Sequence, residues 1–340
     1  MTDILKLLTS GKDVTAAMAE EAMSEIIVGH VAPVQIGALL TALHFRPPTA
    51  QILTGFVRAF REKTLKVRAD SVEDLIDVCG TGGDGHGTFN VSTTVAFVVA
   101  GAGQKIAKHG NRAVSSKCGS FDVLEALGVG FCDNEREARD SIERHGLSFM
   151  YAPSFHPAFR ELAPVRKQIG FRTVMNALGP MLNPAGVRRQ LIGVYSPDLV
   201  IPMAEALGEL GAISAMVVHG HDGSDEISIC APTKVATLEN GKVTVSEIRP
   251  EQFGLERAAP EKIAGGDART NAAILESVVS GTKGAARDIV VLNSGAALVV
   301  GGKAETLAHG IELANKAVDS GAAIEKLKNI RTPIRMGAAQ

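Results

Sequence analysis

The sequence predicts an α/β protein: a small N-terminal all-helical domain precedes a larger α/β domain with a mostly parallel central sheet flanked by helices. Apolar residues in the first 70 positions recur at helical spacing, whereas short apolar runs alternate with helical stretches from Leu75 onward. A chain of 340 residues also fits two domains. We expect residues 1–70 to form the helical domain, joined by a segment near 164–180, and residues 71–163 and 181–340 to form the α/β domain.

Three amphipathic helices are predicted in the N-terminal domain. The first ends near Gly29, the second begins at Pro33 and stops before Pro47 and Pro48, and the third follows directly. Their apolar faces predict one further buried contact, either with a second copy of the chain or with the rest of the same chain. The residues that define the faces are Met18, Ala22 and Ile26; Ile36, Leu39, Leu40 and Leu43; and Ile52, Phe56 and Phe60.

Five short apolar runs predict the strands of the larger domain. Loops that follow parallel strands gather at the carboxyl edge of the sheet, so we expect the unusual loops of this sequence to form one site there. A further segment, 235–248, alternates around Asn240-Gly241 and predicts an antiparallel β-hairpin. The five runs are LIDVCG (75–80), KIAKHG (105–110), LSFMYAP (147–153), QLIGVYS (190–196) and AMVVHG (215–220).

Composition argues against several classes of partner. The 35 basic and 37 acidic residues give a formal net charge of -2, so no overall field attracts nucleic acid or an anionic membrane. The four cysteines form no C-x-x-C pair, which favours reduced thiols over a zinc site. The N-terminus lacks a signal-peptide pattern, and no apolar stretch reaches the roughly 18 residues of a membrane span. We therefore expect a cytoplasmic protein without membrane or nucleic-acid contacts.

The segment VCGTGGDGHGTFNVST, residues 78–93, places five glycines in eight positions directly after a predicted strand. Glycine allows backbone N–H groups to approach a ligand closely, and such loops commonly bind phosphate. The spacing Gly80-x-Gly82-x-x-Gly85 also satisfies the dinucleotide fingerprint. However, the acid that would hold a ribose is missing, because no Asp or Glu occurs between Gly85 and Phe121. The loop therefore predicts a polyphosphate site.

Two further segments extend this anion site. Asn90, Ser92 and Thr93 begin a predicted helix, where they either cap it or offer hydroxyl and N–H groups to an anion. After the next strand, cations lead into SSKCGS, which predicts a second anion-binding turn with Ser120 capping the following helix. A charge run is also typical of a solvated face, but two such loops together favour pyrophosphate. The cluster at the strand end comprises Lys108, His109, Asn111 and Arg112.

Asp225 and Glu226 lie in the glycine-containing turn HDGSDEIS. Adjacent acids are common on solvated surfaces. Polyphosphates, however, bind together with Mg²⁺, which is held by one or two carboxylates, substrate oxygens and water. We expect this pair to hold magnesium facing the two anion loops, with Ser92 able to complete the shell.

Six segments together resemble the anthranilate phosphoribosyltransferase family: GTGGD, NVST, KHGNRAVSSKCGS, PVRKQIGFRT, NALGPMLNP and DGSDEIS occur in the family's order across nearly the whole chain. The resemblance implies an enzyme of tryptophan biosynthesis that joins anthranilate to phosphoribosyl pyrophosphate, with inversion at the anomeric carbon and no covalent nucleophile. It also implies a homodimer formed through the helical domains and two Mg²⁺ ions. Phe121 and Met175 depart from the family pattern beside the implied site.

The resemblance also implies roles for individual residues. Arg166 would grip the anthranilate carboxylate in one plane, although the sequence around it also fits a surface helix arginine. The implied catalytic residues are Lys108, His109, Asn111 and Arg166. Implied contacts to phosphoribosyl pyrophosphate are Gly80, Gly83, Asp84, Thr88, Asn90, Val91, Ser92, Thr93, Lys108 and Ser120; those to anthranilate are Gly80, His109, Asn111, Arg166 and Gly179; and those to Mg²⁺ are Ser92, Asp225 and Glu226.

Three alternatives are weaker. A pyrimidine nucleoside phosphorylase shares the implied fold and the Lys-His pair, but Asn111-Arg112 stands where such enzymes have a serine after the histidine. A non-catalytic relative that binds nucleic acid would have lost the Asp-Glu pair and gained a basic face. A dinucleotide oxidoreductase lacks its ribose-binding acid.

Overall fold

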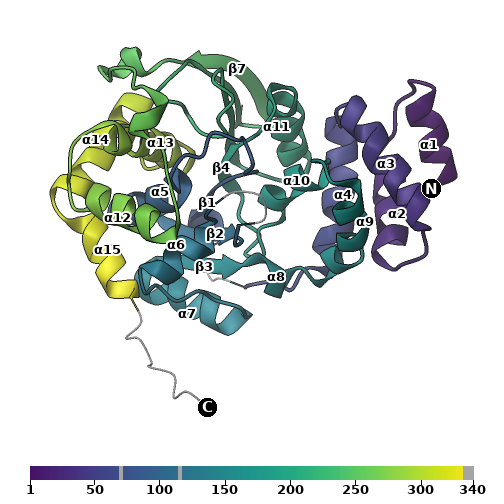
Figure 1. The fold of residues 1–340 in the computed structure, drawn as a ribbon, viewed down its shortest axis with the longest axis horizontal. Helices are drawn as coiled ribbons and strands as arrows, with labels where there is room; N and C mark the ends of the chain where they lie inside the picture. The colour runs from purple at the N-terminus through teal and green to yellow at the C-terminus, as the bar shows by residue number, and fades with distance from the viewer. Residues whose placement is uncertain (69–71, 114–116, 332–340) are drawn as a thin grey trace.

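The computed structural model describes residues 1–68, 72–113 and 117–331. Its N-terminal part is a helical bundle (Figure 1) of α1 (Thr2–Thr9), α2 (Ala16–Ile27), α3 (Pro33–Phe45) and α4 (Ala50–Lys63). The three predicted helices are confirmed, and α1 is additional. α2 and α4 pack closely because Gly55 has no side chain: a Cβ there would lie 2.6 Å from the Cβ of Ala19.

The larger domain contains one seven-stranded sheet with the order β3-β2-β1-β4-β5-β6-β7. The first five strands pair in parallel, and β6 and β7 pair antiparallel, which confirms the mostly parallel sheet and the hairpin. Asn240 and Gly241 form the hairpin turn with φ of 50° and 73°. The strands are β1 (Leu75–Gly80), β2 (Lys105–Gly110), β3 (Leu147–Tyr151), β4 (Arg189–Gly193), β5 (Ser214–Gly220), β6 (Thr233–Glu239) and β7 (Lys242–Ile248).

Helices cover both faces of the sheet, and the sheet separates two main hydrophobic cores. A helical layer containing α5 and α12 to α15 packs with one set of strand side chains, and α11 packs with the other set and with α4 (Figure 1). The second core runs continuously from the helical bundle to the sheet, so the bundle buries an apolar face against its own chain. These helices are α5 (Val91–Gly101), α6 (Ser120–Ala126), α7 (Glu135–His145), α11 (Val200–Glu209), α12 (Ala268–Val279), α13 (Ala285–Val300), α14 (Leu307–Asp319) and α15 (Ala322–Ile330).

Short helices connect the bundle to the sheet: α8 (Ala152–Phe155), α9 (Ala163–Ile169) and α10 (Met175–Leu178). α9 contacts α3, and between α9 and α10 the carbonyl of Arg172 lies 3.1 Å from Nδ1 of His44 on α3. This segment therefore joins the helical bundle to the loops of the sheet. Among the described residues, no helix is both long and apolar enough to span a membrane.

Candidate active site

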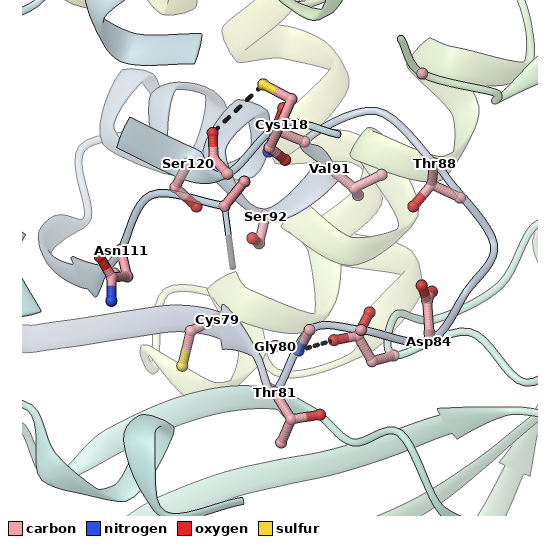
Figure 2. A pocket seen from close by; sticks show the side chains of 18 of the residues that line it. Cys79, Gly80, Thr81, Asp84, Thr88, Val91, Ser92, Asn111, Cys118 and Ser120 are labelled. Atoms are coloured by element: carbon pink, nitrogen blue, oxygen red, sulfur yellow. Dashed lines mark hydrogen bonds between the residues drawn. The ribbon is translucent and has the colours of Figure 1, made fainter. Parts of the chain in front are cut away.

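A cavity of about 550 Å³ opens at the carboxyl edge of the parallel strands. Figure 2 shows the loop after β1 running from Gly80 past Asp84 and Thr88 to Val91, with Ser92, Asn111 and Ser120 also facing the cavity. The structure therefore brings together residues from three separate loops. The sequence-predicted residues that line the cavity are Gly80, Gly83, Asp84, Thr88, Asn90, Val91, Ser92, Lys108, His109, Asn111, Ser120, Asp225 and Glu226. Thr93, Arg166 and Gly179 are not among the lining residues.

The glycine loop has a conformation that other residues rarely adopt. Gly82, Gly83, Gly85 and Gly87 have φ of 69°, 70°, 82° and 63°. Gly82 N–H donates to Oδ2 of Asp225 at 2.7 Å, which ties the loop to the turn after β5.

Asp225 also approaches two strand ends directly. A Cβ on Gly80 would overlap its side chain, and a Cβ on Gly193 would overlap its backbone carbonyl. The absence of both side chains therefore sets the position of this acid in the cavity.

The N-terminus of α5 is directed to the cavity without a side-chain cap. Asn90 is the N-cap residue, but its Oδ1 accepts from Nδ2 of Asn271 at 2.9 Å and its Nδ2 donates to the carbonyl of Cys118 at 3.4 Å. Capping therefore does not explain Asn90, and the positive end of this helix can favour an anion.

The prediction that Ser120 caps the next helix is wrong. α6 begins at Ser120, and its N-cap is Gly119, whose N–H donates to Asp122 at 2.8 Å. The same carboxylate accepts the N–H of Ala113 at 2.9 Å, so Asp122 ties the loop before α6 to the first turn of the helix. The hydroxyl of Ser120 is left at the cavity wall. The serines at 115 and 116 of the predicted anion turn lie outside the described residues.

Three acids converge on one wall of the cavity. Burial first, and then the nearby Asp84, raise the pKa of Asp225 to about 6. Burial, followed by Asp225, raises the pKa of Glu226 well above its usual value, although the N–H of Ser92 donates to Glu226 and opposes this shift. Oδ2 of Asp84 is buried and, within the part of the chain that the structure describes, has no hydrogen-bond donor. Such crowded carboxylates are costly unless a cation or a proton neutralises them.

These acids could take part in a magnesium site that is completed by a bound substrate. Among the residues described, no three His, Cys, Asp or Glu side chains form a metal cluster. Mg²⁺ suits this arrangement, since it commonly takes one or two carboxylates and fills its remaining positions with substrate oxygens and water. Asp225 and Glu226 could provide the carboxylates and Ser92 a hydroxyl, and Asp84 belongs to the same charge cluster.

Lys108 lies beneath the cavity floor with only 2% of its surface exposed. Its ammonium group donates to the carbonyl of Val78 and, at 3.2 Å, to the hydroxyl of Ser92. Buried Asp77 lies nearby. Burial raises its pKa, whereas Lys108 and the Nδ2 of Asn183, which donates to Oδ2 of Asp77 at 2.7 Å, lower it. The resulting pKa of Asp77 is about 6. Lys108 is therefore held rigidly and brings one positive charge to the acid cluster.

His109 forms a buried pair with His156. Their Nε2 atoms are 3.0 Å apart, and Nδ1 of His156 lies 3.1 Å from the hydroxyl of Thr64 at the end of α4. Burial lowers the pKa of His109 well below its usual value and that of His156 to about 4, so both rings are neutral at pH 7. The ring of His109 also hydrogen-bonds the carbonyl of Gly179. Gly179 does not line the cavity, and His109 connects it to the cavity.

Sequence reasoning missed part of the wall. Arg172 and Asn176 come from the segment after α9, and Gly265, Gly266 and Asn271 come from the N-terminal end of α12. The run AGGDARTN, 264–271, could have indicated this part of the wall. It has the composition of an anion-binding turn, because two adjacent glycines precede Asp267, the N-cap of α12, and Asn271 follows in the first helical turn. Arg166 lies on α9, outside the lining, and burial lowers the pKa of its guanidinium.

Comparisons with known proteins show which family the chain resembles. Residues 2–64 match the helical bundle domain, and residues 72–324 the a/b domain, of a glycosyl transferase family. The anthranilate phosphoribosyltransferase of Rubrobacter xylanophilus is 50% identical over 96% of both chains, and that of Symbiobacterium thermophilum is 47% identical over 97% of both.

Two solved structures are also similar. The anthranilate phosphoribosyltransferase of Thermus thermophilus matches with a TM-score of 0.89 at 40% identity, covering 96% of this chain and 98% of that chain. The enzyme of Saccharomyces cerevisiae, solved in complex with PRPP and Mg, matches with a TM-score of 0.85 at 28% identity, covering 96% and 95%. The resemblance indicated by the sequence motifs is confirmed: the chain belongs to the anthranilate phosphoribosyltransferase family.

Proposed function

We propose that this protein transfers the phosphoribosyl group of 5-phosphoribosyl 1-pyrophosphate to the amine of anthranilate, giving N-(5-phosphoribosyl)anthranilate and pyrophosphate in tryptophan biosynthesis. The observation that carries the proposal is the convergence of a left-handed glycine loop, the uncapped N-terminus of α5 and an acid cluster on one cavity. Together they supply N–H donors for phosphates and carboxylates for the metal that accompanies them.

In the proposed reaction, the amine nitrogen bonds to the anomeric carbon as the bond to pyrophosphate breaks. The pyrophosphate leaves with the electron pair, and the amine loses a proton. Lys108 and the N–H groups of the glycine loop and of α5 stabilise the departing charge. Ser92, Asp225 and Glu226 would hold Mg²⁺, which would neutralise negative charge on the pyrophosphate. We propose that two Mg²⁺ ions bind.

The proposed acceptor site lies on the side of the cavity that faces the helical bundle. Asn111 and Arg166 would hold anthranilate, with Gly80, His109 and Gly179 around the ring. The neutral His109 suits a positioning role, since its Nε2 is already engaged with His156. Because the amine is weakly basic, holding it in line with the leaving group contributes more than a strong base would.

The donor site in this proposal comprises Gly80, Gly83, Asp84, Thr88, Asn90, Val91, Ser92, Thr93, Lys108 and Ser120. Thr93 is fully buried and its hydroxyl has no partner among the described residues, so it would act from behind the lining. We also propose the domain division given above, with 164–180 as the joining segment, and a cytoplasmic location.

The proposed activity is tested by following the loss of anthranilate fluorescence in the presence of phosphoribosyl pyrophosphate, with Mg²⁺ or with EDTA. We expect magnesium-dependent consumption. In Arg166→Ala, the KM for anthranilate should rise about 10- to 100-fold because a charge-assisted hydrogen-bonded pair is lost. Lys167→Ala, which alters the next, exposed residue of α9, is the matched control. No consumption by the wild-type protein would refute the activity, and an unchanged KM would remove Arg166 from the acceptor site.

We propose that the protein is a homodimer formed through its helical domains. Val34 and Phe45 on α3 are 78% and 82% exposed, although the opposite side of the bundle is buried against the chain itself. Such apolar exposure is typical of an interface. Sedimentation analysis should show a dimer, and Phe45→Asp should shift it to the monomer. A monomeric wild-type protein would contradict the proposal.

A further inference from the structure

Arg172 is a positively charged group in the cavity that has no role in the reaction described so far. It lies between α9 and α10, on the segment that joins the helical bundle to the sheet, and it lines the cavity. Among the described residues, its guanidinium forms no hydrogen bond and no ion pair. By contrast, Arg112 on the same cavity is paired with Glu125 at 2.7 Å. A half-buried guanidinium facing an anion site without an acceptor is available to a ligand.

The guanidinium is positioned against the glycine loop. A Cβ on Gly83 would lie 2.8 to 2.9 Å from three of its atoms, so the absence of a side chain at Gly83 leaves room for Arg172. On another side, the guanidinium carbon lies 5.4 Å from the ring centre of Tyr195, a cation–π contact. The N–H of Tyr195 donates to the hydroxyl of Thr81 at 3.0 Å, so this aromatic support is tied to the same loop.

We infer that Arg172 is a further substrate-binding residue of this site and that it donates hydrogen bonds to the pyrophosphate group of the donor. This inference rests on the proposed function. The guanidinium fork matches two phosphate oxygens in one plane, and its support by Tyr195 reduces the conformational freedom lost on binding. The glycine loop that Arg172 contacts at Gly83 also holds Asp225 through the N–H of Gly82, so one loop connects this cation with the acid cluster.

The same residue connects the anion site to the helical bundle. Its carbonyl is paired with Nδ1 of His44 on α3 at 3.1 Å, while its side chain contacts the glycine loop. Arg172 therefore lies on the same segment as α9 and the proposed acceptor residue Arg166.

Calorimetric titration with inorganic pyrophosphate and Mg²⁺ tests this inference without requiring an acceptor. Arg172→Ala should raise the Kd for pyrophosphate about 10- to 100-fold, as expected for lost hydrogen bonds to a charged group, and Arg172→Lys should lie between it and the wild type. Arg160→Ala, which removes the same charge from an exposed position outside the cavity, should bind as the wild type does. Thermal unfolding verifies that each variant is folded, and Arg172→Lys carries the test if Arg172→Ala does not fold.

An unchanged Kd in the folded Arg172 variants would overturn the inference, as would a raised KM for anthranilate with unchanged pyrophosphate binding. Tyr195→Leu should weaken pyrophosphate binding, whereas Tyr195→Phe, which keeps the ring, should not. If the wild-type protein binds pyrophosphate but does not consume anthranilate, the proposed function fails while the assignment of Arg172 can still be judged.

Discussion

Glu226→Gln is expected to lower the kcat of phosphoribosyl transfer about 10²- to 10³-fold while making the metal-free protein more stable. The variant keeps the size of the side chain and removes one carboxylate from the cluster with Asp225 and Asp84. In the proposed site that carboxylate holds magnesium, but without the metal it is a half-buried charge beside two like charges. The control is Glu239→Gln, at an exposed position on β6.

The measurements are kcat at saturating substrates, the thermal midpoint in EDTA, and the stoichiometry of Mg²⁺ binding in the presence of pyrophosphate. We expect the wild type to bind two ions and the variant to lose at least one. A variant that keeps full activity would remove Glu226 from the metal site. A lower midpoint in EDTA would show that its carboxylate stabilises the metal-free fold.

The pH dependence of the free energy of unfolding should also distinguish Glu226→Gln from the wild type. Glu226 has a higher pKa in the folded protein than in the unfolded chain. As pH rises above about 4.5, the unfolded chain loses the proton of this carboxyl group while the folded protein still keeps it. Stability that this group contributes below that pH is therefore lost as pH rises through its folded pKa. Urea unfolding in EDTA should show a smaller loss between pH 4.5 and 7 in Glu226→Gln than in the wild type. His109 and His156 act in the opposite direction, but the difference between the two proteins cancels their effect.

Lys108→Gln is expected to lower kcat by about 10²- to 10³-fold with a much smaller change in the KM for anthranilate. The side chain is buried and is fixed by Val78 and Ser92, so its charge needs no rearrangement as the pyrophosphate departs. The substitution also leaves Asp77 without its cation, which should destabilise the fold above the raised pKa of Asp77, about 6. Steady-state kinetics at pH 7 and unfolding at pH 5 and 8 are the measurements. Lys242→Gln, exposed on β7, is the control, and an unchanged kcat would contradict the role of Lys108.

The sequence revealed those parts of the fold that local physics determines. Buried parallel strands appear as short apolar runs, and Asn240-Gly241 takes the left-handed conformations of a tight hairpin. α1 was not predicted, although its buried residues Ile4 and Leu8 lie one helical turn apart in the sequence. The strand predicted over 190–196 is β4, which runs from Arg189 and ends at Gly193.

Site residues were predicted where several chemical signals share one loop. They were missed where a segment that is distant in the sequence packs against that loop. Asp225 and Glu226 were found because two acids in a glycine turn are conspicuous. Arg172 and Asn271 each come from segments whose approach to the glycine loop depends on tertiary packing. The capping role given to Ser120 is wrong because α6 already begins at Ser120, and the residue before it, Gly119, is the N-cap, whose N–H donates to Asp122.

The close approach of Asp225 to Gly80 and Gly193 has a consequence for how the sequence can vary. Either glycine, if it gained even a methyl group, would displace the acid, and the acid cannot be moved to a neighbouring position without leaving two gaps in the strand ends. The three positions lie on β1, on β4 and after β5, more than 100 residues apart at their extremes. They should therefore be inherited as a unit, and a change at one should be tolerated only together with changes at the others.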